Sequence, residues 1–215
     1  MPAVHNAGWP FIAAFFALTA FLGLLWAPLG WIGLFLSGWC IYFFRDPNRI
    51  VPEKAGIVVA PADGIVSKIS SCALPKELEM GEGERLKISI FLNVFDVHVT
   101  RMPAAGRVKK IFYFPGLFLN ASLDKSSELN ERYATALDLD EGGDLVVVQI
   151  AGLIARRIKN DLVENMKINR GDRFGIIRFG SRVDIYLPED YEVSILEGQR
   201  MIGGETIVGQ LKNKI

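Results

Sequence analysis

The chain has 215 residues, half of them hydrophobic, and its 24 basic side chains balance 24 acidic ones. Balanced charge gives no reason to expect a nucleic-acid partner or a polyanionic substrate. The only histidines are His5 and His98, which excludes a metal centre built from several imidazoles, so we expect no metal. The two cysteines, Cys40 and Cys72, lie in unlike settings, which predicts no disulfide framework and fits a reducing compartment. The length predicts one domain with room for an appendage.

The first 44 residues carry no Asp, Glu, Lys or Arg, and the stretch from Phe11 to Phe44 is almost wholly apolar. It is longer than one membrane span requires, and Ala27-Pro28-Leu29-Gly30 interrupts it near the middle. Because Pro followed by Gly is typical of a turn, we favour a helical hairpin that enters the bilayer and returns over one long kinked helix. A hydrophobic hairpin buried in a soluble protein is a weaker alternative. A cleaved signal peptide would need a basic region before the apolar stretch, which this chain lacks.

Basic residues begin directly after this block, at Arg45, Arg49 and Lys54. The positive-inside tendency therefore places the remainder of the chain on the cytoplasmic face of the cell membrane. Pro47 ends the helical pattern, because proline restricts the residue before it and cannot donate a backbone hydrogen bond. We expect a membrane-anchoring helical hairpin over residues 1–44 and a second domain over residues 45–215.

Short runs rich in β-branched and aromatic residues alternate with turns beyond residue 45, and little of this part has a helical pattern. We therefore expect a mainly β, mostly antiparallel domain, a sandwich or barrel of the lipoyl-like hybrid type. Segments 74–84 and 122–132 are expected to be loops. The expected strands are 57–60, 65–69, 86–99, 106–114, 145–150, 154–158, 174–178, 182–187 and 192–196.

Three polar residues stand out in this domain: Asp63 in a Pro-Ala-Asp-Gly turn, His98 near the end of an apolar strand, and Ser181 directly after Gly180. Each has an ordinary structural explanation, namely an Asx turn, a satisfied buried imidazole, and a β-bulge within one strand. A carboxylate, an imidazole and a hydroxyl are also the parts of an activated nucleophile. Their spacing in the sequence does not decide whether they meet.

Several motifs, in their order and spacing over nearly the whole chain, resemble the short bacterial form of phosphatidylserine decarboxylase. They are the apolar start with Phe44-Arg45-Asp46-Pro47, then Pro61-Ala62-Asp63-Gly64, Asn93 to Pro103, Pro115 to Ala121, and Arg178 to Asp184.

The resemblance implies a proenzyme that makes its own cofactor. In this family the serine after the glycine attacks the preceding carbonyl, and an ester forms by an N-to-O acyl shift. Elimination and hydrolysis then cut the chain. Carried onto this chain, the cut falls between Gly180 and Ser181 and gives a β chain, residues 1–180, and an α chain, residues 181–215. The α chain would begin with a pyruvoyl group derived from Ser181.

The same resemblance implies the reaction. The pyruvoyl group would form a Schiff base with the amine of phosphatidylserine in the membrane. After loss of carbon dioxide, phosphatidylethanolamine would be released, because the group acts as an electron sink.

The resemblance also implies roles for other residues. We expect Asp63 to assist self-cleavage and His98 to move protons or position the substrate carboxylate. Longer members of the family have a second histidine three residues after the one that matches His98, where this chain has Arg101. An arginine is always protonated and cannot take the proton of Ser181. We therefore expect Arg101 to stabilise an oxyanion or to bind the lipid phosphate.

Two other functions stay open from the sequence. One is a non-enzymatic, membrane-anchored β-domain adaptor, and the other is a pyruvoyl decarboxylase of a soluble amino acid. The sequence also leaves a homodimer open.

Overall fold

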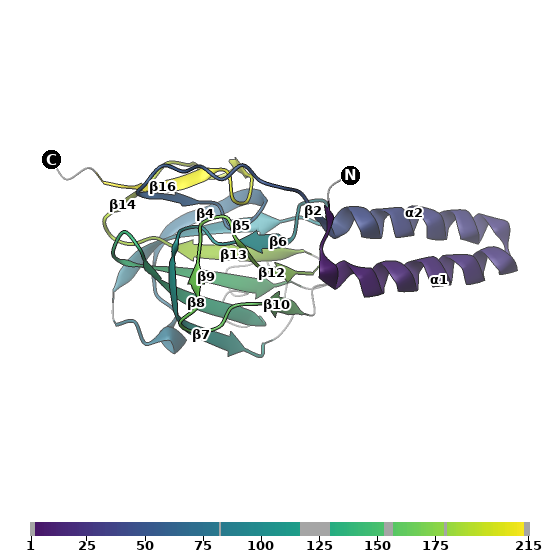
Figure 1. Cartoon of the computed structure of the whole chain (residues 1–215), viewed down its shortest axis with the longest axis horizontal. Coiled ribbons are helices and arrows are strands. Elements are labelled where there is room, and N and C mark those ends of the chain that lie inside the picture. The colour runs from purple at the N-terminus through teal and green to yellow at the C-terminus, as the bar shows by residue number, and fades with distance from the viewer. Residues whose placement is uncertain (1–2, 82, 117–129, 153–156, 179, 213–215) are drawn as a thin grey trace.

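A pair of packed helices projects from one end of a β domain (Figure 1). The structure is a computed structural model that describes residues 3–81, 83–116, 130–152, 157–178 and 180–212. The helices are α1 (Trp9–Leu25) and α2 (Ala27–Phe43). The expected hairpin is therefore confirmed, and a single kinked helix is excluded.

The turn of the hairpin differs from the expectation. It consists of Trp26, whose backbone is extended, with φ −163° and ψ 121°. Ala27-Pro28-Leu29-Gly30 forms the first turn of α2 instead of the loop. Proline is well accommodated there, because the first backbone N–H groups of a helix have no partner within the helix.

Small residues allow the two helices to approach closely. A Cβ added to Gly30 would lie 2.9 Å from Cα of Gly23, and a Cβ added to Gly33 would lie 2.7 Å from Oγ1 of Thr19. Thr19 and Ser37 share a hydrogen bond of 3.0 Å across the interface. Such contacts hold helices together where the surroundings are as apolar as the side chains.

The two ends of the hairpin are joined at its base. Strand β1 (Ala3–Val4) pairs with β2 (Arg45–Asp46), and the 3-10 turn η1 (Asn6–Gly8) leads into α1. The backbone N–H of His5 also donates to the carbonyl of Phe44. The residues before α1 and after α2 are therefore held together where the hairpin meets the β domain.

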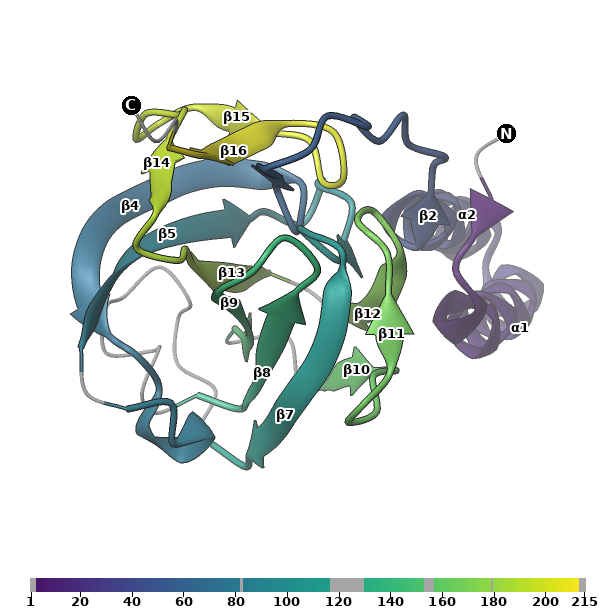
Figure 2. The same cartoon turned by 60° about the vertical axis from the view of Figure 1, so that its left-hand side comes forward.

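The β domain is built on an eight-stranded sheet that curls into a half-barrel (Figure 2). Its strand order is β11-β7-β8-β9-β13-β5-β4-β15, and all of its neighbouring strands are antiparallel. This confirms the expected mainly β, barrel-like fold. The strands are β4 (Gly64–Ala73), β5 (Glu84–Leu92), β7 (Gly106–Phe114), β8 (Arg132–Leu139), β9 (Asp144–Ala151), β11 (Lys167–Ile168), β13 (Ser181–Tyr186) and β15 (Arg200–Met201).

Two smaller antiparallel sheets complete the domain. One has the order β10-β12-β6, and the other has the order β14-β16-β3. Their strands are β3 (Ile57–Val59), β6 (Val99–Arg101), β10 (Ile158–Asn160), β12 (Arg173–Ile177), β14 (Tyr191–Val193) and β16 (Ile207–Leu211).

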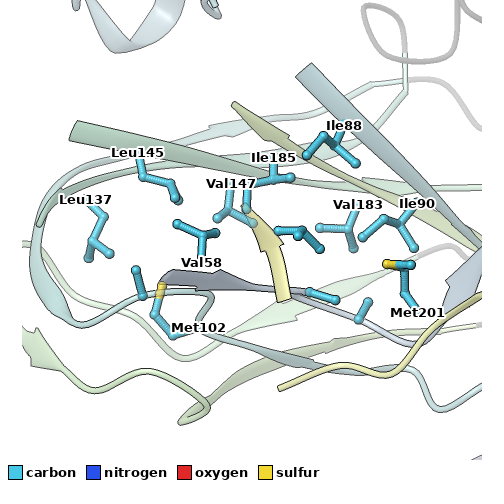
Figure 3. Close-up of a cluster of buried hydrophobic side chains, with 14 of the residues drawn as sticks. Val58, Ile88, Ile90, Met102, Leu137, Leu145, Val147, Val183, Ile185 and Met201 are labelled. Carbon is cyan, nitrogen blue, oxygen red and sulfur yellow. The ribbon is translucent and has the colours of Figure 1, made fainter. Parts of the chain in front are cut away.

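The main hydrophobic core lies on one face of the eight-stranded sheet. Side chains alternate between the two faces of a strand, so Val183 and Ile185 of β13 enter this core together with Ile88 and Ile90 of β5 (Figure 3). Each fully buried aliphatic side chain of this kind contributes about 2 kcal/mol. The intervening residues of β13 face the other side of the sheet.

The expected strand over residues 86–99 is two strands from different sheets. Strand β5 ends at Leu92, because Asn93 and Asp96 bond to the backbone between them. The N–H of Asn93 donates to Oδ2 of Asp96 at 2.9 Å, and the N–H of Phe95 donates to Oδ1 of Asn93 at 2.8 Å. The chain then enters β6 in the three-stranded sheet.

Other expectations need smaller corrections. Strands β8 and β16 were not expected, and the 3-10 turn η2 (Lys76–Leu78) lies within the expected loop 74–84. Most of the expected loop 122–132 and of the expected strand 154–158 lies outside the described residues, as does most of the Pro115 to Ala121 motif.

Candidate active site

Ser181 is the first residue of β13, in the middle of the large sheet. It lies between Ala151 of β9 and Leu92 of β5 and is fully buried. Its Oγ has no hydrogen-bond partner among the described residues. Leaving a buried hydroxyl unpaired costs about 1–3 kcal/mol, so a serine here is poorly explained by packing alone.

Gly180 precedes it in a conformation that favours glycine, with φ +65°. A Cβ added here would meet no described atom within 4 Å. The backbone conformation, not crowding, therefore requires glycine. Gly180 also lies between β12 and β13, which belong to different sheets, so the alternative of a bulge within one strand is wrong.

His98 meets this turn from the loop before β6. Gly180 donates its backbone N–H to Nε2 of His98 at 3.3 Å, across 82 positions of sequence. Nδ1 of His98 lies 3.0 Å from the carbonyl oxygen of Asp96, so Nδ1 carries the hydrogen and donates it. Nε2 is therefore an unprotonated acceptor next to the residue that precedes Ser181.

The imidazole of His98 is fully buried and neutral. Burial lowers its pKa to about 4, against the smaller opposing effect of the bond to Asp96. The ring of Phe43, at the end of α2, lies with its centroid 4.4 Å from that of His98. The base of the hairpin thus forms part of the wall around His98.

Asp63 is not in contact with Ser181. Its carboxylate accepts two 2.8 Å hydrogen bonds from Arg49 and one of 2.8 Å from the backbone N–H of Gly203. It directly precedes β4, which is two strands from β13 in the sheet. Two strand spacings are about 10 Å. In this chain Asp63 holds the segment that follows the hairpin.

Arg101 is also occupied elsewhere. Its guanidinium donates to the carboxylate of Asp46 at 3.0 Å, to the carbonyl of Pro47 at 2.9 Å and to the carbonyl of Gly171 at 3.1 Å. Arg173 bonds the other oxygen of Asp46 at 2.5 Å. These contacts fasten the chain that leaves α2 to the β domain, and the expected role of Arg101 toward an oxyanion or a phosphate stays a prediction.

The base of the hairpin lies beside the site, a contact that was not predicted from the sequence. Phe43 and Phe44 pack with Ile12, Val97 and Ile176 in a second buried cluster. Arg45 donates to the carbonyl of Phe95 at 2.6 Å. The motif Phe44-Arg45-Asp46-Pro47 forms the contact between the base of the hairpin and the candidate site.

Comparison with known proteins bears on what this arrangement does. The profile of the family described as "Phosphatidylserine decarboxylase" matches residues 36–209. The chain belongs to this family.

Three relatives in the family are each called "Phosphatidylserine decarboxylase proenzyme". The protein of Paramagnetospirillum magneticum is 47% identical over 97% of this chain and 87% of its own length. Those of Cereibacter sphaeroides and Nitrobacter winogradskyi are 51% and 49% identical, over 97% of this chain and 90% and 85% of their own lengths. Membership in the family sets aside the alternatives of a non-enzymatic adaptor and of a decarboxylase of a soluble amino acid.

Proposed function

We propose that Gly180, Ser181 and His98 carry out the self-processing of this chain. As a member of its family, the chain is a phosphatidylserine decarboxylase made as a proenzyme, and its cofactor is a pyruvoyl group. The observation that supports these three residues is the bond from the N–H of Gly180 to the neutral His98, beside an unpaired buried hydroxyl.

The residues present fit a cofactor made from this serine. The hydroxyl of Ser181 bonds no described group, and Gly180 has no Cβ beside the carbonyl that it would attack. A pyruvoyl group in this position supplies an electron sink for the charge that develops when carbon dioxide leaves. Gly180 and His98 surround the position in which it would form.

The cut proceeds through groups of the chain itself. Oγ of Ser181 adds to the carbonyl carbon of Gly180 while His98 accepts the hydroxyl proton on Nε2. The C–N bond then breaks as His98 returns this proton to the nitrogen, which leaves an ester on Oγ and a free amine on residue 181. Removal of the α-proton of residue 181 expels Gly180 as a carboxylate, and water then replaces the amine, which leaves as ammonia.

The two chains remain one folded unit after the cut. Strand β13 pairs along its whole length with β9 and with β5, and both partners belong to the β chain, residues 1–180. Strands β15 and β16 of the α chain, residues 181–215, likewise pair with β4 and β3. Cutting at the first residue of β13 therefore removes no strand pairing.

The hairpin is proposed as the anchor that holds this site at the membrane. Residues 6–25 form one helical segment with a mean hydropathy of 1.9, of which 11% is buried. Leu24 and Trp31 near the tip and Phe35 halfway along α2 are 87%, 72% and 76% exposed. Helices of this length extend about 26 Å, slightly less than the hydrocarbon thickness of a bilayer. The basic residues Arg45 and Lys54 after α2 favour the cytoplasmic face.

A substitution of His98 tests its role directly. We expect His98→Gln to slow conversion of the proenzyme by about 100-fold or more, because it removes the only base placed beside Gly180 among the described residues. Conversion is followed by gel after synthesis, and decarboxylation is then measured on phosphatidylserine vesicles. His5→Gln, at the other histidine, is the control. Normal cleavage and normal decarboxylation in His98→Gln would refute the assignment.

A further inference from the structure

The face of the large sheet opposite the core borders a cavity that the proposed chemistry does not use. Its volume is about 660 Å³, within the range of small-molecule sites. Lys87 of β5 and Asp184 and Tyr186 of β13 line it. Since Val183 and Ile185 face the core, these residues lie across the sheet from it, and the side chain of Ser181 also lies on the core side.

Charged side chains are buried along this face, where apolar ones would suffice for packing. Arg182 donates to both carboxylate oxygens of Asp184, at 2.6 and 2.7 Å, and this pair is almost wholly buried. Arg132 pairs with Glu77 at the edge of the cavity. The two carboxylates among the described lining residues are thus already neutralised by arginines.

Three lysines line the cavity among the described residues, and Lys87 is the buried one, whereas Lys68 and Lys76 are exposed. Lys87 is 9% exposed, and it makes no hydrogen bond or ion pair in the described part of the chain. The stem of Lys87 is buried, whereas its ammonium is accessible from the cavity and can pair with an anion there. Tyr186, directly opposite Lys87 in the sheet register, offers a neutral hydroxyl, since burial raises the pKa of this phenol.

Apolar side chains form the rest of the wall. Val148 and Ile150 of β9 and Leu74 after β4 face the same space. The lining therefore combines three lysines, Lys68, Lys76 and Lys87, with surfaces suited to carbon atoms. An anion as small as inorganic phosphate would leave most of the volume empty.

The position favours a ligand from solution. In the register, Lys87 lies opposite Tyr186, five residues along β13 from Ser181, which is about 17 Å. Strand β14, which follows Tyr186, lies at the end of the domain opposite the helices (Figure 1). The cavity thus extends away from the proposed membrane anchor.

We propose that this cavity is a second binding site, for a small water-soluble phosphate ester whose phosphate pairs with Lys87 and whose carbon part packs on Val148 and Ile150. A lysine ammonium is a good point-charge partner for phosphate. The site is separate from the one that processes the chain and acts on lipid.

Glycerol 3-phosphate is the probe. Detergent-solubilised full-length protein is titrated with this compound, and the melting temperature is recorded at each concentration. A parallel titration with sodium chloride at the same ionic strength is the control. We expect a saturable rise, with affinity about tenfold weaker in Lys87→Met and unchanged in Lys109→Met, a half-exposed lysine of β7 outside the cavity. Lys87→Arg, which keeps the charge, should retain most of the response.

Three outcomes would overturn the proposal. They are no saturable response in the wild type, an equal response in Lys87→Met, or a response only to phosphatidylglycerol vesicles, which would assign the cavity to a lipid headgroup. Broadening of the phosphorus resonance of glycerol 3-phosphate by the wild type gives a second reading that does not require Lys87→Met to fold. Its absence would also overturn the site.

Discussion

At the scale of single residues, the site depends on a histidine that burial keeps neutral. Nδ1 of His98 is occupied by the carbonyl of Asp96, so its lone pair lies on Nε2, toward Gly180. A protonated imidazole could neither accept that N–H nor take a proton from Ser181. The burial that keeps His98 neutral also makes the stability of the folded protein depend on pH.

Stability should therefore depend on pH through His98. Its pKa is 6.5 in the unfolded chain and about 4 in the folded one, so the unfolded chain binds more protons between these values. The free energy of unfolding should fall as pH falls from 6.5 to 4, by up to about 3 kcal/mol at about 1.4 kcal/mol per pH unit. Urea unfolding of wild type and His98→Gln at several pH values measures the difference. Equal pH dependence in both proteins would contradict a buried neutral imidazole.

Gly180 permits a test that separates backbone strain from crowding. A side chain at φ +65° costs about 1 kcal/mol, although no described atom would touch the added Cβ. Gly180→Ala should lose about this much stability and should also cleave more slowly. Gly198→Ala is matched, because Gly198 has φ +82° and equally open surroundings, and it should lose similar stability but cleave normally. Equal cleavage by both variants would show that the conformation of Gly180 is not used in the cut.

Ser181, Gly180 and His98 could be proposed from the sequence, because their residue types suit the chemistry and their motifs resemble those of the family. The sequence could not place Asp63 or Arg101, because the partners of those side chains come from the chain that follows the hairpin. Arg49 and Asp46 lie 14 and 55 positions from them, and no pattern in a single sequence pairs charges at such distances.

At the scale of elements, the segment after α2 joins the anchor to the β domain through two sets of charged contacts. Asp46 accepts from Arg101 and Arg173, and Arg49 donates to Asp63. The helices and most strands could be predicted, because the spacing of apolar residues that marks them is visible within a short stretch of sequence. The sequence did not predict that residues 86–99 divide between two sheets, since that division depends on the bonds of Asn93 and Asp96.

The pair of Arg49 and Asp63 gives a prediction at this scale. If Asp63 assists processing by holding this segment, Arg49→Ala should slow cleavage as much as Asp63→Ala, and the double variant should be no slower than either. Cleavage half-times from pulse-labelled protein measure this. Arg49→Ala that cleaves normally while Asp63→Ala does not would instead assign Asp63 a direct role.

At the scale of the whole molecule, the helices project from one end of the β domain (Figure 1), and there Phe43 of α2 contacts His98, which accepts the N–H of Gly180. An enzyme that acts on a lipid headgroup gains from this arrangement, because tethering raises the local concentration of its substrate. Phe95 is 60% exposed next to Arg45 at the base of the hairpin. We expect this side chain to enter the membrane interface.

Phe95→Ser should lower decarboxylation of phosphatidylserine in vesicles several-fold and leave the activity in detergent micelles nearly unchanged. Val163→Ser is the control, because Val163 is 65% exposed and its loop bonds to Val108, toward the far end of the sheet. Equal activities of the two variants on vesicles would remove Phe95 from the interface.

The central claim is that this chain cuts itself between Gly180 and Ser181 and that Ser181 becomes the cofactor. The most direct test is the intact mass of the purified protein. We predict that the 23.9 kDa chain is replaced by two fragments, residues 1–180 and residues 181–215, the second with a pyruvoyl group at its start. Ser181→Ala should remain one chain. A wild-type protein that stays whole at 23.9 kDa while it decarboxylates phosphatidylserine would contradict the account.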